Sequence, residues 1–207
     1  IFISILLPIA LRGNEAVLKE RKLIESAFHL GNISAIEFFA TKYKTKNYKK
    51  INFKEIKIKQ LEKIKYELLN KVNKIPISMI LAQAIIESGW GSSRFAKEGN
   101  ALFGEWVWHS ELGIKPRKNS DANFSVKSFD NIMDSVNSYI LNINRHLAYE
   151  DLRKYREALA KKGDIITGYE AANYLNGYAE IGYQYVTKVK EMIISNNLSK
   201  FENAVLE

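Results

Sequence analysis

One acidic side chain in this sequence is placed as a proton donor would be. Glu87 lies near the end of an apolar run that starts at Pro76, and Gly89 follows it as a helix stop signal. Apolar residues recur at three- and four-residue spacings along this run, which predicts a buried helix of about three turns. A carboxyl group that apolar neighbours partly desolvate favours its protonated form. Glu87 is therefore predicted to hold a proton near neutral pH and to give it to a leaving oxygen atom.

The residues around Glu87 resemble a known family. The segment ESGWG, followed closely by GNALFGEW, is similar to the catalytic-acid segment of family 73 glycoside hydrolases. These enzymes are bacterial N-acetylglucosaminidases of peptidoglycan with a lysozyme-like helical fold. Four blocks, in the same order along the chain, resemble the Bax-type branch of the family: LLPIALRGNE, IPISMILAQAIIESGWGSSRFAKEGNALFGEWVW, SFDNIMDSVNSYILNINRHLAYEDLR and YAEIGYQYVTKVKEMI. The Lys-rich stretch 41–59 carries none of this resemblance.

Cleavage of a glycosidic bond also requires a group that stabilises or captures the oxocarbenium-like centre. In the resembling family, a second acid, where one is seen, sits on a β-hairpin after the catalytic Glu, and this chain departs from the usual spacing there. The candidates are Glu105 in the GEW turn, Glu111, and Asp121 in a run typical of a hairpin tip. Glu111 is preferred because its loop-rich segment could fold over a cleft.

A 2-acetamido substrate can instead use its own carbonyl oxygen as the nucleophile, so that no second acid is required. A Tyr hydroxyl would then orient the acetamido group. YAEIGYQY resembles the family's late motif, which matches Tyr178, Ala179, Glu180 and Tyr185 here. The resemblance makes Tyr178 the leading candidate for this catalytic role. For Glu180 and Tyr185, substrate binding and an ordinary structural or solvated position both stay open.

Several aromatic residues near Glu87 are candidates for a sugar-binding surface. Sugars present apolar C–H faces, so glycan clefts combine aromatic platforms with a few polar groups. Large aromatics also fill cores, and Trp90 and Phe103 are expected mainly to hold the loop of the acid in place. Trp106 and Trp108 fit a cleft wall and a core equally well. Asn100 is expected to brace the loop through side-chain bonds to the backbone, or to be a simple turn residue.

Composition limits the class of protein. The 207 residues are 46% hydrophobic and 12% aromatic, which is typical of one globular domain, predicted here as a single glucosaminidase domain over 1–207. There are 31 Lys and Arg against 23 Asp and Glu, a balance that favours an anionic partner: nucleic acid, an anionic membrane surface or an acidic cell-wall polymer. The absence of cysteine excludes disulfides, zinc thiolates and cysteine nucleophiles.

The first residues, IFISILLPIALRGNE, are apolar without being an intact signal peptide, because no basic region precedes them and no small-residue cleavage site follows. The apolar run is also too short for a membrane-spanning helix of about 20 residues. We expect it to form a core helix. A signal peptide or membrane anchor could have preceded it.

The remaining pattern is mostly helical. Alternation in NFSVKSF, within a Gly-, Pro- and Asn-rich segment, predicts a small β-hairpin excursion over 107–129 near the active site. The stretch 41–59 interleaves Lys with aromatics, as nucleic-acid binders do, but it lacks a recognised motif and is expected to be a solvated, mobile connector. The predicted class is α+β, predominantly α. Helices besides that of Glu87 are expected over 15–31, 33–43, 61–72, 131–149, 155–159, 169–175 and 183–194.

Other chemistries have little support. The three histidines, His29, His109 and His146, have no metal-ligand spacing, and neither a phosphate-binding glycine loop nor a GxSxG nucleophile elbow occurs. We therefore expect no metal and no cofactor.

The combined interpretation is an endo-β-N-acetylglucosaminidase that cleaves the β-1,4 bond after GlcNAc. Its partners would be peptidoglycan glycan strands and not nucleic acid. The protein would act as a monomer in the cell envelope, either in the periplasm or after export. A lytic transglycosylase or muramidase of lysozyme-like fold and a non-catalytic cell-wall-binding module are the alternatives.

Overall fold

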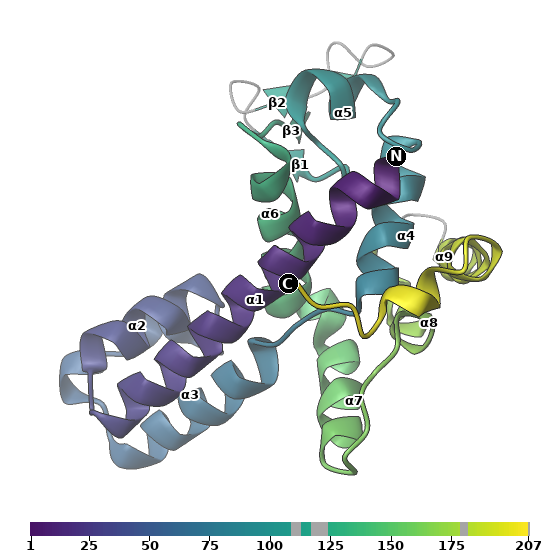
Figure 1. The fold of residues 1–207 in the computed structure, drawn as a ribbon. Helices are drawn as coiled ribbons and strands as arrows, with labels where there is room; N and C mark the ends of the chain where they lie inside the picture. The colour runs from purple at the N-terminus through teal and green to yellow at the C-terminus, as the bar shows by residue number, and fades with distance from the viewer. Residues whose placement is uncertain (109–112, 117–123, 179–181, 207) are drawn as a thin grey trace. The chain divides into compact units, whose positions relative to one another are not determined.

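The structure, a computed structural model, describes residues 1–108, 113–116, 124–178 and 182–206 (Figure 1). The chain divides into two compact units. The first, called the acid unit below, contains Ile1–Gly13, Pro76–Ile140 and Thr167–Glu207. The second, called the lysine-rich unit, contains Asn14–Ile75 and Leu141–Ile166. Two helices, α1 (Phe2–His29) and α6 (Ile132–Arg145), contribute residues to both.

Helix α4 (Ile77–Ser88) is the centre of the acid unit. Ten of its twelve residues are buried, which explains its nearly continuous apolar sequence. It packs against α8 (Gly168–Ala171), α9 (Tyr183–Ser195) and the 3₁₀ turn η7 (Leu198–Phe201), and Figure 1 shows these elements beside it. Two further short helical elements of the acid unit are α5 (Arg94–Gly99) and the 3₁₀ turn η6 (Ala172–Tyr174).

A close approach at Gly168 holds α8 against α4. A Cβ atom at this position would overlap the Ser78 hydroxyl, so the contact requires glycine. The Glu202 carboxylate accepts hydrogen bonds from Ser78 Oγ at 2.5 Å and from the Gly168 backbone N–H at 2.6 Å. One carboxylate thus ties together α4, α8 and the turn that follows α9.

The β excursion is a three-stranded antiparallel sheet. Its strands are β1 (Trp106–Val107), β2 (Gly113–Ile114) and β3 (Ser125–Lys127), in the order β1-β3-β2. Trp106 pairs with Val126, and Gly113 pairs with Lys127. The central strand is the one predicted from the alternation in NFSVKSF. The prediction of an α+β, mainly helical, lysozyme-like fold with a small β excursion is confirmed.

The lysine-rich unit contains α2 (Ile33–Lys42), α3 (Ile58–Lys71), α7 (Glu150–Ala160) and the second part of α1. Short 3₁₀ turns connect them: η1 (Tyr48–Lys50), η2 (Phe53–Glu55) and η5 (Leu147–Tyr149). The stretch predicted as a solvated connector exposes most of its lysines, yet it buries Tyr43, Thr45 and Phe53. Those buried side chains attach the stretch to the core of the unit.

Several helix boundaries differ from the prediction. Helix α6 ends at Arg145, short of the predicted 149, and α7 begins at Glu150, ahead of the predicted 155. The apolar N-terminal run and the predicted helix 15–31 are one continuous helix, α1, with Pro8 inside it. Pro8 is the seventh residue of this helix, beyond its first turn, so one intrahelical backbone hydrogen bond is missing at that position. Helix α5 was not predicted. Within the described residues, none of the helices is both long and apolar enough to cross a lipid bilayer.

Candidate active site

Glu87 occupies the last turn of α4, just before Gly89 ends the helix in the left-handed conformation at φ +55°. Its side chain is half-buried. Burial raises the pKa of the Glu87 carboxyl above its ordinary value of 4.5, although a hydrogen bond from Tyr185 and the charge of Lys188 act in the opposite direction. The carboxyl therefore holds its proton to a higher pH than an exposed glutamate.

A chain of hydrogen bonds ends on this carboxyl. The Tyr139 hydroxyl donates to Gln83 Oε1 at 2.5 Å, and Gln83 Nε2 donates to the Tyr185 oxygen at 3.0 Å. The Tyr185 hydroxyl in turn donates to Glu87 Oε1 at 2.8 Å. Burial and the Glu87 charge raise the pKa of Tyr185, so this hydroxyl keeps its proton and remains a donor. The three hydrogen bonds of this series connect Tyr139 to Glu87, and Glu87 Oε1 is the final acceptor.

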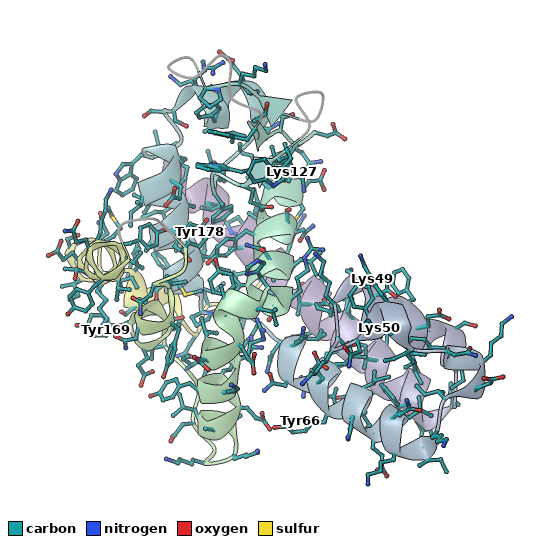
Figure 2. The ribbon with its side chains drawn as sticks, turned by 180° about the vertical axis from the view of Figure 1, so that it is seen from behind. Lys49, Lys50, Tyr66, Lys127, Tyr169 and Tyr178 are labelled. Atoms are coloured by element: carbon teal, nitrogen blue, oxygen red, sulfur yellow. The ribbon has the colours of Figure 1, made fainter. Side chains whose placement is uncertain are left out.

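The ALFG loop lies beside the other carboxyl oxygen. Gly104 has φ +62°, and a Cβ atom there would lie 3.5 Å from Glu87 Oε2. The Tyr178 hydroxyl donates to the Phe103 carbonyl at 2.8 Å, and the Phe103 ring stacks on Tyr139 with centroids 4.0 Å apart. Tyr178 also stacks on Tyr185 at 5.3 Å. Figure 2 labels Tyr178 in this part of the molecule. The aromatic rings therefore join the loop to the hydrogen-bond chain.

The turn after Glu87 and the turn at Asn100 both contain strained backbone. Trp90 and Asn100 have φ values of +58° and +50°. Trp90 is 46% exposed and meets Phe2 edge to face at 6.1 Å. Asn100 Nδ2 donates to the carbonyls of Phe129 and Asp130 at 3.0 and 3.2 Å, which is the bracing expected of it. Its role toward a substrate stays a prediction.

The aromatic candidates divide by exposure. Phe103 is buried, as a packing residue would be, whereas Trp106 and Trp108 are exposed. Trp106 stacks on Phe124 with centroids 4.4 Å apart and an interplanar angle of 11°, which presents a flat apolar surface at the sheet. Such a surface suits the C–H face of a sugar ring.

Of the candidates for a second acidic group, the structure describes Glu105. Glu105 Oε2 accepts a hydrogen bond from Ser138 Oγ at 2.8 Å, and Lys127 Nζ donates to the same hydroxyl at 3.0 Å. Glu111, Asp121 and Glu180 lie outside the described residues. The structure thus joins Glu87, Tyr178 and Tyr185 in one network and leaves the roles of Glu111 and Glu180 as predictions. Among the residues that the structure describes, no group of His, Asp or Glu is arranged to hold a metal ion.

Comparison with known proteins identifies the family. The model of the family Glucosaminidase, described as mannosyl-glycoprotein endo-beta-N-acetylglucosaminidase, matches residues 63–198, well over half of the chain. The chain belongs to this family. The matched residues include Glu87, Tyr178 and Tyr185, whereas the Lys-rich stretch 41–59 lies before them.

The chain is also similar to Protein bax of Escherichia coli strain K12, which agrees with the predicted Bax-type branch. The two are 31% identical over 190 residues, or 89% of this chain and 64% of Protein bax. The chain therefore spans a little less than two thirds of the length of this relative. No solved structure gave a significant match.

Two members of the hydrogen-bond network at Glu87 were not predicted from the sequence. Tyr139 was interpreted only as an apolar helix position, and Gln83 was not singled out. Both side chains are buried and bonded to each other. A signal was present for Gln83, because it is a polar residue inside an otherwise apolar helix. A buried polar side chain needs a partner, so such a residue marks the position of a buried network.

Proposed function

We propose that this glucosaminidase is a peptidoglycan hydrolase, an endo-β-N-acetylglucosaminidase that cleaves the β-1,4 bond on the reducing side of GlcNAc. Glu87 is its general acid. The observation that carries the proposal is the half-buried Glu87 carboxyl, with its raised pKa, inside the matched segment. A general acid works best when its pKa lies near the operating pH, and burial moves Glu87 in that direction.

The hydrogen-bond chain supports a specific position for the proton of Glu87. Gln83 donates to the Tyr185 oxygen, so the Tyr185 proton is directed to Glu87 Oε1. The transferable proton then sits on Oε2, the oxygen beside Gly104. This proton passes to the glycosidic oxygen as the C1–O bond breaks, and a water molecule completes hydrolysis at C1. The carboxylate that remains is stabilised by the Tyr185 hydrogen bond and by the charge of Lys188.

The centre left at C1 requires a second group. Either Glu111 fills this role, or the acetamido oxygen of the substrate does so while the Tyr178 hydroxyl orients the acetamido group. In the structure, the Tyr178 hydroxyl is bonded to the Phe103 carbonyl, so orienting a substrate would require it to exchange or share this bond. The proposed contacts to the sugars are Trp90, Asn100, Trp106, Trp108 and Glu180. Phe103 and Tyr185, which were also candidates, are buried and would act by holding the loop and the acid in place.

The proposed substrate also determines the proposed location. Peptidoglycan lies in the cell envelope, so the protein would act there, in the periplasm or after export, as a monomer on glycan strands.

Mass spectrometry of digested sacculi tests the proposal. The expected products carry new reducing GlcNAc ends. Anhydro-MurNAc ends would instead show a lytic transglycosylase, and reducing MurNAc ends would show a muramidase. Binding to sacculi without any new ends would show a wall-binding module. Each of these last three results would overturn the proposed activity.

A further inference from the structure

The lysine-rich unit contains a cavity of about 1180 Å³ that the proposed chemistry does not use. The turn 44–50, helix α3 and the segment 145–157 line it. Figure 2 labels Lys49, Lys50 and Tyr66, which belong to this lining. The volume exceeds that of a single small anion and is comparable to that of a site for a drug-sized ligand.

Positive charge dominates the lining. Ten of the lining residues are Lys or Arg and four are Glu. Burial and the neighbouring charges of Lys44, Arg153 and Arg145 lower the pKa of His146, which also lines the cavity. The field within the cavity is therefore favourable to an anion.

Most of the carboxylates in the lining are already engaged. Glu67 forms an ion pair with Lys71 at 3.3 Å, and Glu150 pairs with Lys154 at 2.9 Å. Glu157 accepts hydrogen bonds from Tyr66 and Asn70 and pairs with Lys161. By contrast, six exposed lysines of the lining form no ion pair within the described part of the chain: Lys44, Lys46, Lys49, Lys50, Lys59 and Lys63.

Buried polar contacts fix the turn that carries four of these lysines. The buried Lys71 ammonium donates to the carbonyls of Tyr43 and Lys44 at 3.0 and 2.8 Å. The Glu67 carboxylate accepts the Lys46 backbone N–H at 2.9 Å. The side chains of Glu67 and Lys71 thus anchor the start of the turn to α3. The positive charges are held at one place rather than spread along a free chain, which lowers the entropic cost of binding an anion.

We infer that this cavity binds the carboxylates of short acidic peptides, of the class attached to peptidoglycan strands. The inference rests on the proposed function, because it gives the same substrate a second point of attachment. Lysine ammonium groups act as point charges that suit carboxylates without demanding one geometry. The glutamates in the lining would repel a polymer that is uniformly negative, such as a phosphodiester chain. Peptides place their carboxylates between neutral amide groups and can avoid these positions.

Binding to sacculi tests the inference separately from cleavage. The full chain with Glu87→Gln is used so that the sacculi are not digested, and it is compared with the same chain carrying Lys49→Gln, Lys50→Gln and Lys63→Gln. A matched control removes three exposed lysines of the same unit that lie outside the cavity, Lys19→Gln, Lys22→Gln and Lys162→Gln. Sedimentation is measured with native sacculi, with sacculi whose carboxylates have been amidated, and with glycan strands freed of peptides. Circular dichroism shows that each variant is folded.

The cavity variant should bind native sacculi roughly tenfold more weakly than the control variant, given the modest contribution of each exposed charge contact. The difference between the two variants should vanish on amidated sacculi and on peptide-free strands. Equal binding of both variants to native sacculi would overturn the inference. The inference would also be overturned if the cavity variant lost as much binding to peptide-free strands as to native sacculi. Stronger competition for the cavity by a phosphodiester polymer than by the peptides would overturn it as well. None of these results depends on which glycosidic bond the native chain cleaves.

Discussion

Among the described residues, the fully buried polar side chains of the acid unit are all uncharged, whereas the lysine-rich unit buries three cations. The first group is Ser78, Gln83, Ser88, Ser125 and Ser135, and the buried cations of the second unit are Lys71, Arg153 and Arg156. The cations donate chiefly to backbone carbonyls: Arg156 alone reaches those of Asn70, Lys71, Asn73 and Lys74, as well as the Asn144 side chain. These contacts hold chain segments together.

The uncharged network of the acid unit serves a different purpose. Gln83 and two tyrosines pass hydrogen bonds to a single half-buried carboxyl. Neutral donors orient this carboxyl without forcing it to ionise, and burial still raises its pKa. The comparison indicates that buried charge stabilises the fold in one unit, whereas buried neutral groups keep an exchangeable proton in the other. Substitutions in the two units should therefore have different kinds of effect.

The largest effect is expected for Glu87→Gln. The amide keeps the shape of the side chain but has no transferable acid proton, so cleavage of sacculi should fall by about 10²–10⁴-fold. Folding should not suffer. Because the folded state raises the pKa of Glu87 above 4.5, ionisation of this carboxyl lowers stability as the pH rises above that value. The variant should therefore unfold in urea near pH 7 at the same or a higher denaturant concentration than the native chain.

The matched control is Glu191→Gln on α9, where the side chain is exposed. It should retain full cleavage activity. If Glu87→Gln also retained activity, or lost it only by unfolding, the distinction between the two units would fail.

Arg156→Met is expected to have the next largest effect, this time on stability. It leaves several carbonyl oxygens without this donor, and a buried acceptor left unsatisfied typically costs about 1–3 kcal/mol. Urea unfolding followed by circular dichroism measures the change in the free energy of unfolding. Lys154→Met, on the exposed face of the same helix, should change it little. A similar stability for both variants would show that the buried cation is not a structural anchor.

Tyr185→Phe should have a smaller effect, which changes the pKa of Glu87 rather than the fold. It removes the hydrogen bond to Oε1, which we expect to lower the cleavage rate roughly tenfold. That bond lowers the pKa of Glu87, so its loss should raise this pKa and move the alkaline limb of the pH–rate profile to higher pH. Tyr183→Phe, two residues earlier with its side chain 78% exposed, is the control. An alkaline limb that stays in place would exclude Tyr185 as the group that tunes the acid.

The amino-acid sequence determined the helix that carries Glu87 and the point where it ends. Apolar spacing over α4 and the left-handed preference of Gly89 are local properties, so both could be recognised without a fold. The alternation that marked β3 is local in the same way. By contrast, the position of β3 between β1 and β2 was not evident, because strand order depends on which strands pair and not on the local pattern of any one strand.

Only the tertiary structure decided which residues meet Glu87. The three hydrogen bonds of the chain join residues 56, 102 and 98 positions apart, and no periodicity within a helix specifies such pairs. The same holds for the lysine cavity. The sequence showed many lysines in 41–59, but the anchoring of their turn by Lys71 and Glu67 depends on how α3 packs. Local sequence determines elements and their buried faces, whereas the packing of those faces determines which polar groups lie within hydrogen-bonding distance.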